Sequence, residues 1–397
     1  MTTRDWISPR VREIPPSGIR RFFELCHGSQ DTISLGVGEP DFATPEPVRA
    51  ACIRALNEGK TGYTPNAGLP ELREAISEYL EAGFDLRYDP REEIIVTVGS
   101  SEAVDLALRA CLVPGDEILV PAPGYIAYGP IAHLCGGKVV EVETTAEQQF
   151  KLTALALAQR ITPRSKVLLV NYPGNPTGSV MTEEDWKPIA KLAIEHDLIV
   201  ISDEVYAELT YGQRHVSIAS LPGMKERTIV ISGFSKAFAM TGWRIGYVCG
   251  NREFLSEMLK IHQYIAMCAP VLGQIAALES LRCGMEAKDH MKEIFDQRRH
   301  MFVQGLRNIG LPCHEPQGAF YAFPSIAHTG LNSEVFARLL LEEAGVGAVP
   351  GHVFGNGGEG HLRFSYAAST DNLNIALERM ERFLRELEPV VPVADVV

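Results

Sequence analysis

The sequence contains no long, uninterrupted apolar run, and this absence argues against a membrane protein. Its longest apolar stretch, from Tyr264 to Leu278, is broken by Pro270, Gly273 and Gln274 and is too short to cross a bilayer. The first residues also lack the apolar segment that a secretory signal peptide needs. We therefore expect a protein that makes no membrane contact.

Positive charge is also scarce, since 37 Lys and Arg face 50 Asp and Glu, for a formal net charge of −13. Proteins that bind nucleic acids present basic faces to the phosphate backbone, so this balance argues against a nucleic-acid partner. The eight cysteines are scattered without a CxxC pair, which is typical of core residues in a reducing cytoplasm. No histidines show a metal-ligand spacing such as HExxH, so we expect no catalytic metal.

Short β-rich runs alternate with longer helical patterns over the first 250 residues. The predicted strands are Glu92–Gly99, Glu117–Pro121, Lys138–Glu143, Val167–Asn171, Leu198–Asp203, Thr228–Ser232 and Trp243–Gly250. Several are continuously apolar and are separated by predicted helices such as Ser101–Cys111 and Glu183–Glu195. This pattern indicates an α/β fold with a mostly parallel seven-stranded sheet flanked by helices. Only SKAFAMTG separates the last two strands, which is short for a crossover helix and favours an antiparallel pair.

The pattern changes after about Asn251. A long helical region is expected through Leu306, followed by strands near Ala319–Phe323 and His361–Tyr366 and a final helix from Asp371 to Glu388. We therefore expect two domains. The large one covers residues 46–289, and a smaller α+β domain combines residues 1–45 with residues 290–397.

Lys236 is the first candidate for chemistry. It follows a predicted buried strand and has Phe234, Phe238, Met240 and Trp243 as sequence neighbours. A lysine considered alone is most often a solvated surface group. Apolar surroundings lower the pKa of a lysine amine, however, and so make it fit for Schiff-base chemistry.

Asp203 and Tyr206 form a second candidate pair. Asp203 is at the C-terminal end of a predicted strand, where α/β sheets bind ligands. The alternative is a capping role. A carboxylate at this place can instead pair with a pyridinium nitrogen and keep it protonated, which makes the ring an electron sink. Tyr206 can donate a hydrogen bond to a phenolate-like oxygen of such a ring.

Two loops complete the set of candidates. The segment from Asn171 to Gly178 has the composition of a plain turn, but a rigid loop also suits an asparagine amide that must be held in place, and we expect a cis bond at Asn175-Pro176. The segment from Thr97 to Glu102 joins a strand to a helix. Its free N–H groups and two serine hydroxyls favour an anion site, which is compatible with a simple N-cap.

Together these motifs resemble the pyridoxal-phosphate-dependent class I and II aminotransferases of fold type I. The likeness covers nearly the whole chain, from Ile33 to beyond Arg363. Within the family the sequence is most similar to the prokaryotic aspartate, aromatic and N-acetyl-diaminopimelate aminotransferases, through Ser17-Gly-Ile-Arg20 and Tyr63-Thr-Pro-Asn-Ala-Gly68. The resemblance implies pyridoxal 5'-phosphate as the cofactor.

The resemblance also implies a role for each matching residue. Lys236, Asp203 and Tyr206 would be catalytic, with Lys236 as the Schiff-base lysine and Asp203 as the partner of the pyridine nitrogen. The implied cofactor contacts also include Tyr63 (toward the neighbouring subunit), Ser100, Ser101, Glu102, Tyr125, Asn175, Ser235 and Arg244. The implied substrate contacts are Gly38, Tyr125, Asn175 and Arg363, with Arg363 as the clamp for the α-carboxylate.

The sequence departs from the family pattern at two points. Gly233 stands where many relatives have a serine that helps to hold the phosphate, and Ser235 is the expected substitute. No arginine is assignable to a carboxylate on the substrate side chain, so specificity for a dicarboxylate does not follow from the sequence.

The expected function is transfer of the amino group of an L-amino acid, with aspartate or an aromatic donor favoured, to a 2-oxo acid such as 2-oxoglutarate. We expect ping-pong kinetics, a homodimer with shared active sites and a cytoplasmic location. One alternative is another reaction on the same cofactor, such as that of a carbon–sulfur lyase or a cyclopropane-carboxylate synthase. A second is a cofactor-binding regulatory module, although no basic helix-turn-helix accompanies the match.

Overall fold

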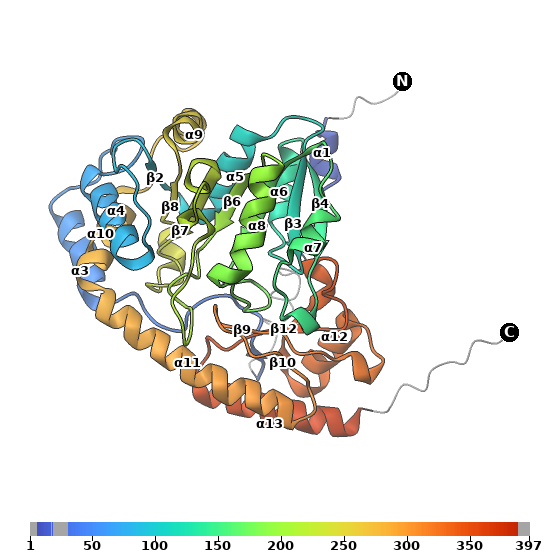
Figure 1. Ribbon diagram of the computed structural model, residues 1–397. Helices are drawn as coiled ribbons and strands as arrows, with labels where there is room; N and C mark the ends of the chain where they lie inside the picture. Colours follow the sequence, from blue (N-terminus) through green and yellow to red (C-terminus); the bar gives the residue numbers. More distant parts are fainter. Residues whose placement is uncertain (1–5, 17, 19–30, 388–397) are drawn as a thin grey trace.

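The computed structural model describes residues 6–16, 18 and 31–387, and its centre is a seven-stranded sheet (Figure 1). The strands are β2 (Ile94–Thr97), β3 (Glu117–Ala122), β4 (Lys138–Glu143), β5 (Ser165–Asn171), β6 (Ile199–Asp203), β7 (Thr228–Gly233) and β8 (Gly246–Cys249). Their order is β2-β8-β7-β6-β5-β3-β4. All neighbours are parallel except β8, which is antiparallel to β7 and to β2. The predicted sheet and its antiparallel pair are confirmed.

Helices cover both faces of this sheet. They are α3 (Glu46–Asn57), α4 (Pro70–Phe84), α5 (Gly99–Cys111), α6 (Tyr128–Leu134), α7 (Ala154–Ala158), α8 (Glu183–Glu195), α9 (Arg252–Ile265) and α10 (Val271–Cys283). Successive strand residues point to opposite faces, so Ile118 and Val120 pack with α5, whereas Leu119 packs with α8. Burial on both faces explains why the strands are continuously apolar. Helix α8 begins with a capping box between Thr182 and Asp185.

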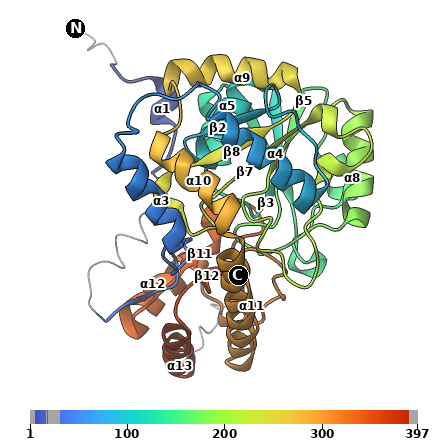
Figure 2. The same cartoon turned by 90° about the vertical axis from the view of Figure 1, so that its left-hand side faces the viewer.

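A second group of elements lies below the large sheet in the views of Figures 1 and 2. Its helices are α11 (Met285–Asn308), α12 (Ser333–Ala344) and α13 (Thr370–Glu386). Its strands are β1 (Ile33–Ser34), β9 (Tyr321–Ala322), β10 (Val346–Gly347), β11 (Val349–Pro350) and β12 (Leu362–Ser365). The antiparallel order is β11-β12-β9, and β1 pairs with β10 in parallel. The domain boundary expected between residues 289 and 290 falls inside α11, and the division stays a prediction.

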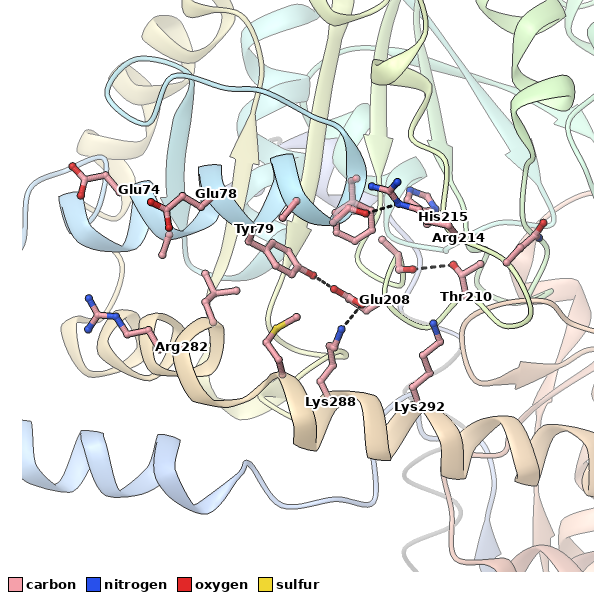
Figure 3. Close-up of a pocket in the computed structure, with 18 of the residues that line it drawn as sticks. Glu74, Glu78, Tyr79, Glu208, Thr210, Arg214, His215, Arg282, Lys288 and Lys292 are labelled. Atoms are coloured by element: carbon pink, nitrogen blue, oxygen red, sulfur yellow. Dashed lines mark hydrogen bonds and ion pairs between the residues drawn. The ribbon is translucent and has the colours of Figure 1, made fainter.

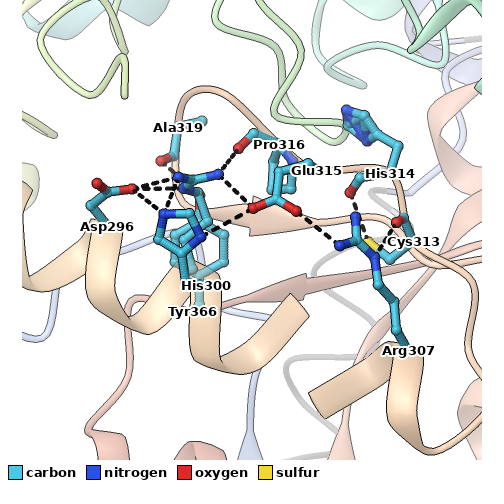
Figure 4. Close-up of polar contacts among 10 residues, drawn as sticks. Asp296, His300, Arg307, Cys313, His314, Glu315, Pro316, Ala319 and Tyr366 are labelled. Carbon is cyan, nitrogen blue, oxygen red and sulfur yellow. Dashed lines mark hydrogen bonds and ion pairs between the residues drawn. The ribbon is translucent and has the colours of Figure 1, made fainter. Parts of the chain in front are cut away.

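Helix α11 is tied to the segment that leads into β9 by a group of ion pairs around Glu315 (Figure 4). The Glu315 carboxylate accepts hydrogen bonds from Arg299 at 3.0 Å and from Arg307 at 2.9 Å, both of which lie on α11. Arg299 also donates to the backbone oxygen of Pro316. Because Arg299 is buried, these contacts satisfy a charge that would otherwise be costly to enclose.

Three expectations need correction. The strand predicted at Trp243–Gly250 starts only at Gly246, because Arg244 adopts left-handed backbone angles (φ 55°) that no strand accommodates. The helical region after Asn251 is three helices, α9, α10 and α11, separated at Pro270 and Gly284. Strands β10 and β11 were not predicted, since two-residue strands leave no periodic signal.

Some expectations concern residues outside the described range. They are the motif positions Ser17 and Arg20 and the last residue of the predicted final helix, Glu388; within the described range that helix ends at Glu386. Among the residues described, no helix combines the length and apolar content that crossing a bilayer requires.

Candidate active site

The predicted site residues come together at the C-terminal ends of the parallel strands. Asp203 ends β6, Asn171 ends β5, and Lys236 follows β7 by three residues. Asn171 and Asp203 are paired in register across the two strands. A cavity of about 640 Å³ opens at this edge. The predicted residues that line it are Gly38, Ser100, Ser101, Tyr125, Asn175, Asp203, Tyr206, Ser235, Lys236, Arg244 and Arg363.

Lys236 extends its amine into this cavity. The Nζ atom donates a hydrogen bond to the backbone oxygen of Gly38 and lies within 6.0 Å of the ring centres of Tyr206 and Phe320. Burial is the main cause that lowers the pKa of Lys236 to about 8, and the nearby Arg244 and Arg363 lower it further. An amine with this pKa is deprotonated in a sizeable fraction near neutral pH, and only that form is a nucleophile or a base.

Asp203 is a buried carboxylate with a partner that was not predicted. The hydroxyl of Tyr128 donates to Oδ2 of Asp203 at 2.7 Å, and the N–H of Val205 donates to Oδ1 at 3.3 Å. Burial raises the pKa of Asp203 to about 6, although these two hydrogen bonds lower it. The carboxylate is therefore held ionised at neutral pH by Tyr128. The only signal for Tyr128 in the sequence was that it lies three residues after Tyr125, a predicted cofactor contact.

Tyr206 shares a hydrogen bond with a second unpredicted residue, Tyr321. Their hydroxyl oxygens are 2.7 Å apart, and either one can be the donor. Tyr321 also packs against Gly38, where an added Cβ would lie 2.3 Å from the tyrosine oxygen. The glycine at position 38 is thus required for β9 to approach the cavity.

Asn175 is fixed by its own loop. The peptide bond to Pro176 is cis, as predicted. The backbone N–H of Asn175 donates to Asn171 Oδ1 at 3.0 Å, and Asn171 in turn donates to the backbone oxygen of Asp203. The amide of Asn175 is therefore positioned relative to the end of β6.

Arg363, on β12, is 2% exposed and stacks on the ring of Tyr321 at 4.5 Å. Its Nη1 donates to Asn175 Oδ1 at 2.8 Å and its Nη2 to the backbone oxygen of Gly36 at 2.6 Å. The buried Nε has no hydrogen-bond partner among the described residues. A buried donor without an acceptor is costly, so this guanidinium is suited to a ligand oxygen.

An anion site lies where α5 begins. Ser100, Ser101, Ser235 and Arg244 line the cavity there, beside the free N–H groups of the first turn. Gly99 has a φ of +75°, and a Cβ at this position would be 2.5 Å from Nη2 of Arg244. The lack of a side chain at Gly99 therefore allows the Arg244 guanidinium to approach the start of the helix.

The departure at Gly233 has a steric explanation. A Cβ added to Gly233 would lie 3.0 Å from Cα of Gly246 on the neighbouring strand and 3.3 Å from Oγ of Ser100. A serine therefore does not fit at this position without movement of β8, whereas Ser235 lines the cavity.

Two predicted residues are not part of this cavity. The Glu102 side chain turns away: its carboxylate accepts from the N–H of Val98 and is 2.8 Å from Nδ1 of His262. The Glu102 side chain therefore caps its own helix, and the predicted cofactor contact of this residue stays a prediction. Tyr63 is 85% exposed and lies outside the lining. Its predicted contact is with the cofactor in the site of a neighbouring subunit.

A second cavity of about 680 Å³ lies between α4 and the first turns of α11 (Figure 3). Tyr79 and Lys288 both contact Glu208 there, the lysine at 2.7 Å. None of the predicted site residues lines this cavity.

The fold and the site define an aminotransferase that uses pyridoxal phosphate. The family model described as "Aminotransferase class I and II" matches residues 30–380, so the chain belongs to this family. A putative aminotransferase of Bacillus subtilis is 53% identical over 96% of this chain and 99% of its own. The aspartate aminotransferase of Pyrococcus abyssi is 46% identical over 96% of this chain and 98% of its own.

Solved structures show the same relationship. The aromatic aminotransferase from Pyrococcus horikoshii superposes with a TM-score of 0.88 at 46% identity, and the match covers 93% of this chain and 99% of that one. Other relatives are named as aromatic-amino-acid and N-acetyl-LL-diaminopimelate aminotransferases. The predicted family and subgroup are confirmed. The residues present fit pyridoxal phosphate, with the anion site at α5 for its phosphate and Asp203 for its ring nitrogen.

Proposed function

We propose that this enzyme transfers the amino group of an L-amino acid to a 2-oxo acid, with 2-oxoglutarate as the acceptor, by ping-pong kinetics. Pyridoxal phosphate, when bound, supplies the electron sink for this chemistry. The proposal rests on one observation above all, the buried guanidinium of Arg363 in the lining of the cavity that contains Lys236. A substrate carboxylate would accept a charge-assisted hydrogen bond from its Nε, which has no partner among the described residues.

The other residues have separate tasks in this proposal. Asp203, held by Tyr128, would keep a negative charge next to the ring nitrogen. Lys236 would take the proton from the α-carbon of the amino donor and deliver it to the C4' carbon of the cofactor, and would move a proton the opposite way for the acceptor, which its lowered pKa permits. Tyr206 and Asn175 would orient the ring through its hydroxyl oxygen, and Tyr125 would cover one face of the ring.

The lining of the cavity supports an aromatic donor over aspartate. Among the described lining residues the basic side chains are Lys236, Arg244 and Arg363, and each already has a task. The remaining lining includes apolar side chains such as Ile14 and Ile126. A second carboxylate would thus need a cation from the partner subunit, whereas an aromatic ring needs only apolar contacts.

We also propose a homodimer. Tyr63 is 85% exposed, and Ile53 and Leu56 on α3 and Tyr264 on α9 are also large apolar side chains with high exposure. Contact with a second chain would remove such side chains from water. Light scattering should give the mass of two chains, and a fully active monomer would contradict a shared site. A cytoplasmic location stays a prediction.

The test of the proposed function is a pair of lysine variants. Lys236→Ala should lose turnover and the visible absorption of lysine-bound pyridoxal phosphate. Lys292→Ala, in the second cavity, should retain both. A panel of amino acids mixed with the holoenzyme in the absence of 2-oxo acid then identifies the donor from the loss of that absorption. Steady product formation in the absence of any 2-oxo acid would contradict transamination and would indicate an elimination reaction instead.

A further inference from the structure

The residue after Asp203 has a buried carboxylate that the proposed chemistry does not use. Glu204 is 3% exposed and lies on the other side of the strand end. Its Oε1 accepts hydrogen bonds from Ser202 at 2.8 Å and from Ser217 at 2.6 Å. Its Oε2 is 2.8 Å from Nε2 of His215. The carboxylate is thus enclosed by donors from two separate segments.

The backbone of Glu204 is fixed as well. Its N–H donates to the oxygen of Ile231 at 2.7 Å, and its own oxygen accepts from the hydroxyl of Ser232 at 3.3 Å. Both partners belong to β7, the strand that leads to Lys236. Glu204 therefore connects the end of β6 with β7 and with the segment around Ser217.

The charge on Glu204 has few neighbours that could neutralise it. Among the described residues, burial together with Glu204 raises the pKa values of Asp203, Tyr88, Tyr247 and Cys249, and the last three remain neutral. His215 is the described hydrogen-bond partner that can carry a positive charge, and it is buried against Phe84 beside the second cavity (Figure 3). On the cofactor side, Asp203 faces Tyr128 and the amine of Lys236.

We propose that Glu204 is a positioning residue for the reaction. Its hydrogen bonds hold the strand end that presents Asp203 and Tyr206, and its carboxylate places a second negative charge behind Asp203. That charge strengthens the hold of Asp203 on the protonated ring nitrogen, since like charges nearby make a carboxylate more basic. The inference rests on the proposed role of Asp203 and extends it to a residue that does not touch the cofactor.

The variant Glu204→Gln removes the charge and keeps the shape. Its amide oxygen can still accept from both serines, and its NH₂ group can face the other tautomer of His215. The matched control is Glu117→Gln. Glu117 is 1% exposed, accepts hydrogen bonds from Thr162 and Arg164, and lies at the opposite end of the same sheet.

Three readouts of the holoenzymes separate positioning from general stability. The first is the pKa at which the absorption of lysine-bound pyridoxal phosphate changes. We expect Glu204→Gln to lower it by about one unit, because the loss of a nearby negative charge makes the protonated form less stable. The second is cofactor release, expected to be about tenfold faster, and the third is a kcat about tenfold lower with little change in KM. Glu117→Gln should change none of the three.

An unchanged spectroscopic pKa in Glu204→Gln, or a shift no larger than that of the control, would overturn the proposal. If Glu204→Gln does not fold, Ser217→Ala supplies a milder test, because it removes one hydrogen bond to Oε1 and retains the charge. Cofactor release from Ser217→Ala should accelerate, and release at the wild-type rate would then overturn the proposal. Loss of the absorption band in Lys236→Ala tests the proposed function independently of these variants.

Discussion

Tyr128 offers a sharp test of the electrostatics around Asp203, because one oxygen atom can be removed without changing the packing. The hydroxyl of Tyr128 donates at 2.7 Å to the buried carboxylate of Asp203. A hydrogen bond to a charged group is worth about 1.5–3 kcal/mol, which corresponds to a pKa change of about one to two units. The variant Tyr128→Phe should therefore raise the pKa of Asp203 from about 6 to about 7–8.

The assay is the affinity of the apoenzyme for pyridoxal phosphate between pH 5 and pH 9. Affinity should fall as Asp203 becomes protonated, so the midpoint of the fall should move upward by about one to two units in Tyr128→Phe. Tyr211→Phe is the matched control, because its buried hydroxyl donates to the backbone oxygen of Ala319 away from the cavity. A midpoint shared by Tyr128→Phe and the wild type would refute the assigned role of this hydrogen bond.

The same carboxyl makes the stability of the apoenzyme depend on pH. The pKa of Asp203 is higher in the folded chain, about 6, than its ordinary value of 3.8. The folded state therefore binds the proton more tightly, and the contribution of Asp203 to stability falls as the pH rises from about 4 to about 6. The loss amounts to about 3 kcal/mol. Denaturant unfolding of the apoenzymes should show a steeper loss above pH 6 in Tyr128→Phe than in the wild type.

Further predictions concern the substrate clamp, the anion site and the ion pairs on α11. Arg363→Lys should lower kcat/KM about 100-fold or more with cofactor affinity unchanged, because an ammonium cannot make two parallel hydrogen bonds to a carboxylate. Wild-type kinetics in this variant would show that Arg363 does not bind the substrate carboxylate. Gly99→Ala should weaken cofactor binding about tenfold, as measured by equilibrium dialysis, because the added Cβ would displace Arg244. Wild-type affinity would show that the Arg244 guanidinium is dispensable for cofactor binding. Glu315→Gln should lower the free energy of unfolding in urea by about 1 kcal/mol, since its ion pair with Arg299 is partly exposed, and kcat should stay constant. A fall in kcat would show that Glu315 also affects the reaction.

Much of the fold was predictable because the strands of the large sheet are continuous apolar runs that end at recognisable motifs. Asp203, Asn175 and Lys236 each follow such a run, and the parallel arrangement alone brings the strand ends together. The pattern failed at Trp243, where apolar composition indicated a strand. The backbone of Arg244 is left-handed there, and apolar composition carries no signal for that conformation.

The unpredicted parts of the site share one cause, which is distance along the chain. Tyr128 is 75 residues from Asp203, and Tyr321 is 115 residues from Tyr206. A periodic pattern in the local sequence does not predict such pairs, because they depend on how strands from different motifs are placed in space. Glu102 shows a purely local effect. Its position in the first turn of α5 directs the carboxylate back to the N–H of Val98, and its predicted contact with the cofactor stays a prediction.

The pairing of β1 with β10 has a consequence for how the enzyme is made. Ile33 pairs with Val346, and Arg363 donates to the backbone oxygen of Gly36, 327 positions earlier in the chain. Contacts of such long sequence separation form late, because a large loop must close before they contribute. The chain must therefore be synthesised to beyond Arg363 before this arginine can take the position in which it would hold a substrate carboxylate. Nascent or truncated chains should acquire the large sheet and its cofactor cradle well before they acquire the ability to hold an amino acid.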